Sequence, residues 1–302
     1  MKEELSNEDI QVLFFLSRYI MIKVEDCQLI YKTKRYYRER INKLIKNGYV
    51  KRYKTHILLD RKGRKRLGEN KAKYLKNIDN KSFMDRLKNI VSIATISINS
   101  KILFIPSWEI KPKDKYTETS RRYIGLLVIE DKKYLCYYLS AMKDYIYIKQ
   151  LMFDIKKSNY DDLIIFMDNY DNICKKYLNF ALNKNNTYII KNTRENKEFL
   201  KNISKINVHE IIENIYNQNA YLSDWKLADY MLENEKYIIY MPFINTEKVQ
   251  QINWHYSINE EYERTIEILT LEENVNKLNE IINKKCHIRT LNKSLLGGIC
   301  EK

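Results

Sequence analysis

The chain has 302 residues and carries 54 Lys and Arg against 39 Asp and Glu, a formal net charge of +15. This length leaves room for two domains, and 44% hydrophobic with 31% charged residues is typical of a folded protein. No apolar run approaches the roughly 20 residues of a membrane-spanning helix, and the acidic start MKEELSNED is not a secretory signal. The five cysteines show no paired spacing, so we expect free thiols, no zinc site and a cytoplasmic protein.

The positive charge is concentrated near the N-terminus. Residues 32–76 hold 18 Lys and Arg but only three acids. Residues 1–76 carry 21 basic and 9 acidic residues, a net charge of +12, which leaves +3 for the other 226 residues. Phosphate contacts release counterions and add up locally, so a surface that binds a polyanion needs such a concentration. A solvated basic face without a partner is the alternative explanation of the same charge.

Two helices are predicted before residue 32. Ser6 and Asp9 form a capping-box pair in front of an apolar run, so the first helix is expected to end near residues 19–21. A short second helix is expected over about residues 24–30, with Cys27 among its inward side chains.

A third helix is predicted from Thr33, which can cap it, to about Asn47. Gly48 follows where a helix needs a left-handed stop. The apolar face of this helix, at helical spacing, consists of Tyr37, Ile41, Leu44 and Ile45.

A basic hairpin and another helix are predicted next. Tyr49–Tyr53 and His56–Leu59 read as two strands around a bend at Lys54 and Thr55. Asp60 is expected to cap a helix from Arg61 to about Asn77. A helix with an apolar back, followed by a basic two-stranded wing, is the layout of a winged-helix domain that binds duplex DNA.

The layout assigns roles to particular side chains. Residues at the start of a recognition helix reach base edges, where arginine can fork onto guanine and glutamate can accept from cytosine. The residues predicted to contact bases are Lys34, Arg35, Tyr36 and Glu39. Those predicted to hold phosphates are Thr33, Arg38, Lys43, Arg52 and Lys54, with Arg61 and Arg64 of the next helix. That next helix could instead serve as a connector or pair two subunits.

The predicted fold class is α+β, with a winged-helix domain at residues 1–76, a linker helix at 77–98, a mixed α/β domain at 99–285 and a tail at 286–302. The strands expected in the mixed domain are 101–105, 123–129, 134–139, 163–167, 188–190, 237–243 and 265–269. The helices expected there are 144–157, 171–183, 195–203, 208–216 and 271–285.

Two short strings carry a resemblance to a known family. Residues 105–111 read IPSWEIK and residues 120–127 read SRRYIGLL, behind the N-terminal layout. Over roughly residues 5–190 the chain resembles the plasmid replication-relaxation proteins of Gram-positive bacteria, which are similar to relaxases of the MobC type. The resemblance implies a protein that acts on plasmid or conjugative-element DNA, with a second domain related to restriction-endonuclease-like folds.

Nucleases with that fold hold Mg²⁺ between carboxylates and place a lysine near the attacking water. The usual pattern is Pro-Asp, a gap, and then Asp or Glu-x-Lys, but here Ser107 follows Pro106. The remaining candidates are Glu109, Lys111, Asp114, Glu130 and Lys132. Because the pattern is incomplete, we expect a degenerate domain that binds no metal or cofactor. Mg²⁺ would be bound only if the domain is an active nuclease.

Three functions remain open at this point. The first is a sequence-specific duplex-DNA-binding protein of a mobile element, acting at an origin of replication or conjugative transfer. The second is a transcriptional regulator whose second domain senses a ligand or partner, and the third is a metal-dependent nicking nuclease. The expected partners are double-stranded DNA, a second copy of the chain and a protein that binds the C-terminal domain, with no membrane.

Overall fold

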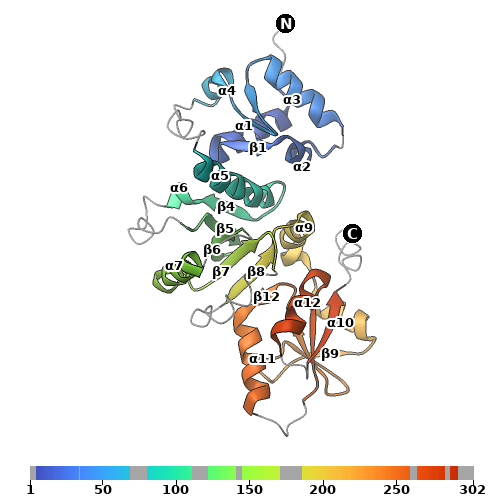
Figure 1. Cartoon of the computed structure of the whole chain (residues 1–302). Coiled ribbons are helices and arrows are strands. Elements are labelled where there is room, and N and C mark those ends of the chain that lie inside the picture. Colours follow the sequence, from blue (N-terminus) through green and yellow to red (C-terminus); the bar gives the residue numbers. More distant parts are fainter. Residues whose placement is uncertain are drawn as a thin grey trace. The chain divides into compact units, whose positions relative to one another are not determined.

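The computed structural model (Figure 1) describes residues 5–33, 35–68, 80–110, 122–140, 145–170, 186–258, 264–282 and 286–291. The fold is mixed α+β, as the sequence predicts, with helices and several sheets. The chain divides into two compact units. The first unit is Met1–Ile110 with Ile124–Ile129, and the second is Lys111–Tyr123 with Glu130–Lys302.

The first unit begins with short helices and a three-stranded sheet. Its elements are α1 (Asn7–Tyr19), β1 (Met21–Lys23), η1 (Val24–Cys27), α2 (Gln28–Tyr31), α3 (Tyr36–Lys46), β2 (Val50–Tyr53), β3 (His56–Leu59) and α4 (Arg61–Arg66). The strands form an antiparallel sheet in the order β1-β3-β2. The sequence did not reveal β1, whose Met21 pairs with Leu58 of the hairpin.

Helix α1 begins as its capping box predicts. The Ser6 hydroxyl accepts from the Asp9 backbone N–H at 3.2 Å, and Asp9 Oδ2 accepts from the Ser6 N–H at 3.0 Å. These two bonds satisfy donors that a helix start otherwise leaves open.

The predicted start of α3 is wrong. The helix begins at Tyr36, its N-cap is Arg35, and no side chain caps it, so Thr33 is not the cap. The predicted core face is confirmed for Tyr37, Ile41 and Leu44, which are buried. Ile45 is only partly buried, so the apolar face is narrower than its spacing suggests.

The end of α3 follows the prediction closely. Gly48 has φ +71°, its N–H bonds to the Ile45 carbonyl at 3.0 Å, and the Tyr49 N–H bonds to the Leu44 carbonyl at 3.0 Å. This pair of bonds is a Schellman motif, which closes the last carbonyls of a helix and turns the chain toward β2.

Helix α4 is shorter than predicted. Asp60 caps it by accepting from the Arg61 N–H at 2.8 Å, but the helix ends at Arg66 instead of continuing to Asn77. Gly68 then has φ +66°, which favours a stop, and residues 69–79 lie outside the described part. Gly63 lets α4 pack closely against Tyr49, just before β2, since a Cβ at position 63 would lie 2.2 Å from the Tyr49 carbonyl oxygen.

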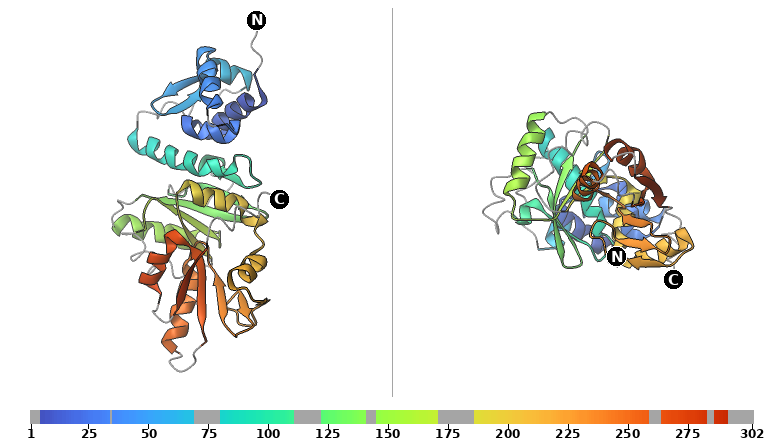
Figure 2. Two further views of the ribbon diagram at one scale, coloured as in Figure 1. Left: turned by 90° about the vertical axis from the view of Figure 1, so that its right-hand side faces the viewer. Right: turned by 90° about the horizontal axis from the view of Figure 1, so that it is seen from below.

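The first unit extends past the predicted linker. Its remaining elements are α5 (Lys81–Ala94), η3 (Thr95–Ser97), β4 (Leu103–Pro106), α6 (Ser107–Ile110) and β5 (Gly125–Ile129). Helix α5 is not an exposed connector, because it buries a face that includes Leu87, Ile90 and Val91 and it contacts α1 (Figures 1 and 2). The Tyr19 hydroxyl also donates to the Phe104 carbonyl at 2.8 Å, so α1 and β4 are joined directly.

The second unit contains the other described strands, β6 to β14. Its elements are β6 (Lys132–Leu139), α7 (Tyr145–Lys157), β7 (Leu163–Met167), β8 (Thr187–Lys191), α9 (Arg194–Asn202), η4 (Ile203–Lys205), α10 (Val208–Tyr216), β9 (Ala220–Leu222), β10 (Tyr230–Leu232), β11 (Tyr237–Tyr240), β12 (Ile244–Asn245), α11 (Thr246–Ile258), β13 (Ile266–Leu271), α12 (Glu272–Ile281) and β14 (His287–Leu291). Strands β6, β7 and β8 pair in parallel and β12 pairs antiparallel with β8. A five-stranded sheet has the order β14-β13-β11-β10-β9.

Several predictions for this unit need correction. Residues 287–291 are not a tail, because β14 pairs in parallel with β13 along its whole length. Helix α11 and strands β9, β10 and β12 were not predicted. The helix predicted at 171–183 lies outside the described residues.

Leu44→Ala should lower the free energy of unfolding of the first unit by roughly 2–5 kcal/mol, because it removes a buried side chain from the α3 core face. The neighbouring Ile45→Ala is the matched control and should cost clearly less, since Ile45 is only partly buried. Urea unfolding of both variants is the measurement. Equal losses would show that the buried face of α3 is assigned to the wrong side.

Candidate nucleic-acid interface

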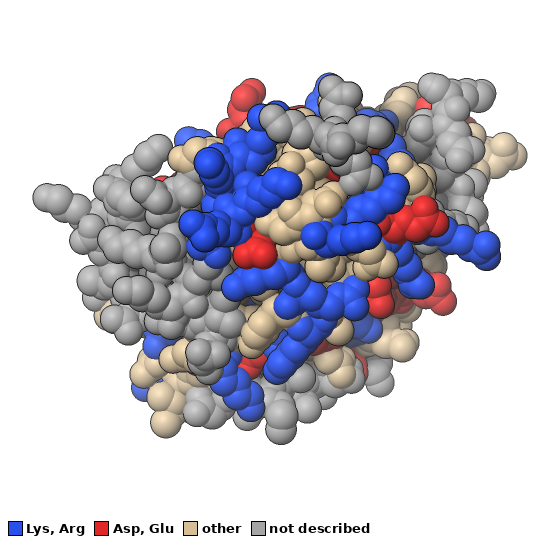
Figure 3. Space-filling view, turned by 90° about the horizontal axis from the view of Figure 1, so that it is seen from above, with Lys and Arg blue, Asp and Glu red and all other residues tan. Residues whose placement is uncertain are grey.

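The outer face of α3 is exposed and largely basic. Tyr36, Glu39, Lys43 and Lys46 follow one another at helical spacing, and all four are exposed. The opposite face of the same helix is buried, so only this face is offered to a partner. Figure 3 shows Lys and Arg gathered on this side of the first unit, with few acids among them.

The residues predicted to read bases lie around the beginning of α3. Arg35 is the N-cap residue, and Tyr36 and Glu39 belong to the first turn; all three are exposed. Thr33 is exposed as well, and Lys34 lies outside the described residues. The first turn of α3 therefore presents a cation, a phenol and a carboxylate side by side.

The phosphate candidates on α3 differ in how they are held. Arg38 Nε donates to the Tyr37 hydroxyl at 3.1 Å, and its guanidinium lies 5.7 Å from the centre of the Tyr37 ring. The ring thus restrains the guanidinium while the side chain stays exposed. Lys43 is exposed two turns after Tyr36.

The hairpin adds further cations. Its two strands close with Tyr53 opposite His56, and Lys54 occupies the bend with φ 53°. Arg52 and Lys54, two of the residues predicted to hold phosphates, are both exposed. Lys54 Nζ lies 5.8 Å from the centre of the Tyr53 ring, which gives this flexible side chain a preferred position.

The two candidates on α4 are not equivalent. Arg61, the first residue of the helix, is exposed. Arg64 is half-buried and donates from Nη2 to the Leu59 carbonyl at 3.3 Å. One of its N–H donors is therefore used within the domain and is not available to a phosphate.

One arginine of α3 points inward. Arg40 donates from Nε to Asp9 Oδ1 at 3.3 Å and from Nη2 to Asp9 Oδ2. The Tyr31 hydroxyl donates to the same carboxylate at 2.6 Å. Asp9 is fully buried, so α1, α2 and α3 are joined through one carboxylate. No local pattern in the sequence indicates this pairing, because the two charges are 31 residues apart.

The Asp9 carboxylate remains charged well into acid. Burial alone would raise its pKa, but hydrogen bonds from Arg40 and Tyr31, together with the Ser6 N–H, outweigh burial and lower the pKa below the ordinary value. Burial, together with the hydrogen bond to the same carboxylate, raises the pKa of the Tyr31 phenol. The network is therefore assembled in its ionic form at neutral pH.

The nuclease candidates do not come together in the described residues. Glu109 is engaged by Arg18, whose Nε and Nη2 donate to its two carboxylate oxygens at 3.1 and 2.9 Å. Ser107 is buried and accepts from Arg86 Nη2 at 3.1 Å. Glu130 has φ 54° in the turn after β5, and Lys132 starts β6.

Two of the catalytic candidates, Lys111 and Asp114, lie outside the described residues. Within the described ranges, no group of three or more His, Cys, Asp or Glu side chains is placed to hold a metal ion. Cys27, Cys136 and Cys286 are free thiols.

Comparisons of the chain with protein-family profiles, curated proteins and solved structures found no match. The resemblance to plasmid replication-relaxation proteins therefore stays a prediction. In the part of the chain that the structure describes, no helix is long and apolar enough to cross a membrane.

Asp9→Asn should destabilise the first unit by on the order of 3 kcal/mol at pH 7, because it leaves Arg40 beside an uncharged partner in a buried site. The folded pKa of Asp9 is below the unfolded value, so its contribution is complete above about pH 4 and is lost as the pH falls through the folded pKa. The difference between wild type and variant should therefore shrink in acid. Urea unfolding at pH 7 and pH 3 measures it.

Asp85→Asn provides the control, because Asp85 forms an exposed i,i+3 pair with Lys88 in α5. It should change stability by no more than about 0.5 kcal/mol at either pH. An Asp9→Asn loss that is equal at pH 7 and pH 3 would contradict the ionic network.

Supercoiled plasmid should be bound without nicking in Mg²⁺ or Mn²⁺, because the Glu109 carboxylate is already engaged by Arg18 and Ser107 replaces the expected acid. Agarose gels of plasmid incubated with purified protein measure this. Nicking that disappears in Glu109→Ala or Glu130→Ala would move the protein to the nuclease class.

Proposed function

We propose that residues 5–68 form a winged-helix domain that binds duplex DNA, with α3 in the major groove and the β2–β3 hairpin as the wing. The observation that carries the proposal is the outer face of α3, which is exposed and basic while its back is buried in the core. The B-DNA major groove is wide enough to admit an α-helix, and a basic hairpin beside such a helix can reach the adjacent backbone.

Base reading and phosphate binding are assigned to different residues. Arg35 precedes the first turn of α3, and Tyr36 and Glu39 belong to it. Residues at this end of a recognition helix contact base edges. The charged residues proposed to hold phosphates are Arg38, Lys43, Arg52, Lys54 and Arg61. Arg64 contributes less in this proposal, because the Leu59 carbonyl already occupies one of its donors.

The resemblance stated for the sequence extends the proposal to a biological setting. It points to a DNA-binding protein of a plasmid or other mobile element that marks an origin of replication or transfer. The alternative is a transcriptional regulator with the same DNA-binding domain. The location of the bound sites distinguishes the two, since repeats at an origin support the first and promoter sites support the second.

The full-length protein should bind duplex DNA with an affinity that falls steeply as salt rises. Five charged phosphate contacts would give a slope of log K against log salt of about −4.5. Arg38→Ala/Arg52→Ala should reduce the magnitude of that slope by about 2, because each lost phosphate contact releases one counterion fewer. Fluorescence anisotropy with a duplex selected from random fragments, at several salt concentrations, is the measurement.

The matched control is Arg194→Ala/Lys226→Ala, which removes the same charge from two exposed residues of the second unit. This variant should keep the wild-type slope. If both double variants change the slope equally, net charge accounts for binding and the assigned surface is wrong.

Arg35→Ala should act on specificity instead. It should reduce the preference for the selected duplex over a scrambled one by roughly 1–3 kcal/mol while the salt slope changes little. Competition between the two duplexes measures the preference. A uniform loss on both duplexes would place Arg35 on the phosphate backbone.

A further inference from the structure

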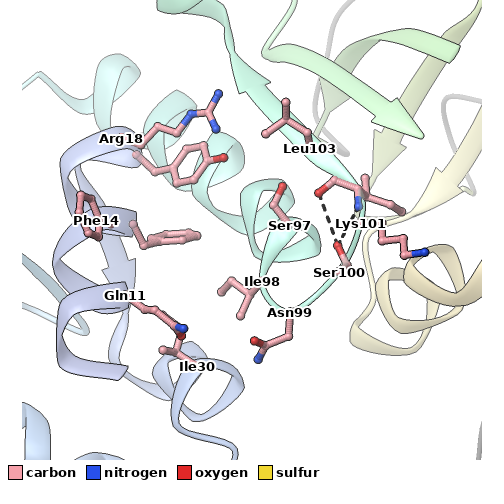
Figure 4. A pocket seen from close by; sticks show the side chains of 13 residues that line it. Gln11, Phe14, Arg18, Ile30, Ser97, Ile98, Asn99, Ser100, Lys101 and Leu103 are labelled. Carbon is pink, nitrogen blue, oxygen red and sulfur yellow. Dashed lines mark hydrogen bonds between the residues drawn. The ribbon is translucent and has the colours of Figure 1, made fainter. Parts of the chain in front are cut away.

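The first unit contains a groove that the proposed DNA surface does not use. It has a volume of about 510 Å³ and runs between α1 and the segment from η3 to β4 (Figure 4). The residues that line it include Phe14, Arg18, Ile30, Lys101 and Leu103. Small-molecule sites typically measure about 300–1,000 Å³, and the volume of this groove falls within that range.

Apolar side chains form the floor of the groove and part of its rim. Ile30, Ile98 and Ile102 are buried and form part of its lining. Phe14 and Leu103 also line it, yet they stay 59% and 40% exposed, respectively. Two large apolar side chains left this open beside a groove are what an apolar occupant would cover.

The charged side chains of the lining are both cations. Arg18 and Lys101 contribute to it, and no Asp or Glu does. In Figure 4, Arg18 and Leu103 lie at one end of the groove, while Gln11, Ile30 and Asn99 lie at the other. An occupant with an anionic group at the Arg18 end and an apolar body toward the other end would match both features.

Arg18 is already held in position for such an anion. Its Nε and Nη2 bind Glu109, which uses one edge of the guanidinium. A guanidinium has five N–H donors, so three remain after these two bonds, and the side chain is still 32% exposed. A guanidinium that is fixed, partly exposed and has unused N–H donors binds a carboxylate well, because little side-chain entropy is lost on binding.

We propose that this groove is a binding site for a small carboxylate with an aromatic or branched apolar body. The carboxylate accepts from the remaining donors of Arg18. The apolar body lies against Phe14, Leu103 and the isoleucines of the floor. A second copy of this chain is a poorer occupant, because it would bring a net charge of +15 to a groove whose two charged lining residues, Arg18 and Lys101, are cations.

The test uses 2-naphthoate as the probe and 2-naphthalenemethanol as its uncharged counterpart, titrated calorimetrically into the full-length protein. Naphthoate should bind saturably, and the alcohol should bind about tenfold more weakly, since it lacks the charge-assisted hydrogen bonds. Arg18→Gln should weaken naphthoate to the level of the alcohol. Arg194→Gln, at an exposed residue of the second unit, should change nothing.

Glu109→Gln separates binding from folding. Like Arg18→Gln it breaks the ion pair, but it keeps the guanidinium and removes a competing acid. Naphthoate should bind this variant as tightly as wild type or more tightly. Loss of binding in both variants would mean that the ion pair only supports the fold, and it would overturn the assignment.

Two other results would also overturn the proposal. Equal affinities for naphthoate and the alcohol, or no saturable binding of either, would show that no carboxylate site exists. A dimer seen in sedimentation that dissociates in Phe14→Ser would show that a second copy fills the groove. None of these measurements involves DNA, so they do not depend on the proposed function.

Discussion

The N-terminal part of the molecule depends on one buried carboxylate. Asp9 is fully buried and accepts hydrogen bonds from the Ser6 backbone, the Tyr31 hydroxyl and the Arg40 guanidinium. A buried charge is costly unless it is paired and hydrogen-bonded, so all of these partners must stay in place while the unit is folded. Since the partners come from the start of α1, the end of α2 and the middle of α3, the three helices are fixed relative to one another.

This constraint shapes both proposed sites. Arg40 is held inward by Asp9, while Glu39, Lys43 and Lys46 stay exposed on the outer face of α3, where the proposed winged helix would meet DNA. A recognition helix that is already fixed loses little freedom on binding, which favours affinity. Helix α1 contributes at both ends, with Asp9 near its start and Arg18 in its last turn at the groove.

Local signals in the sequence were sufficient for much of this unit. The capping box of α1, the Gly48 stop and the hairpin with its two-residue bend all depend on neighbouring residues, and the structure confirms them. The missed features depend on distant residues: Asp9 with Arg40, Arg18 with Glu109 91 residues away, and β14 beside β13. Composition and periodicity do not indicate which distant residues will pair. The groove at Arg18 is lined by residues from distant parts of the chain, so it could not be predicted either.

Hydrogen–deuterium exchange of the full-length protein, with and without a selected DNA duplex, tests the DNA-binding surface most directly. Amides of Arg35–Lys46 and of the hairpin, residues 50–59, should become protected when duplex is added, while α9 and α10 of the second unit exchange unchanged. Protection confined to the second unit, with none in α3 or the hairpin, would contradict the proposed interface.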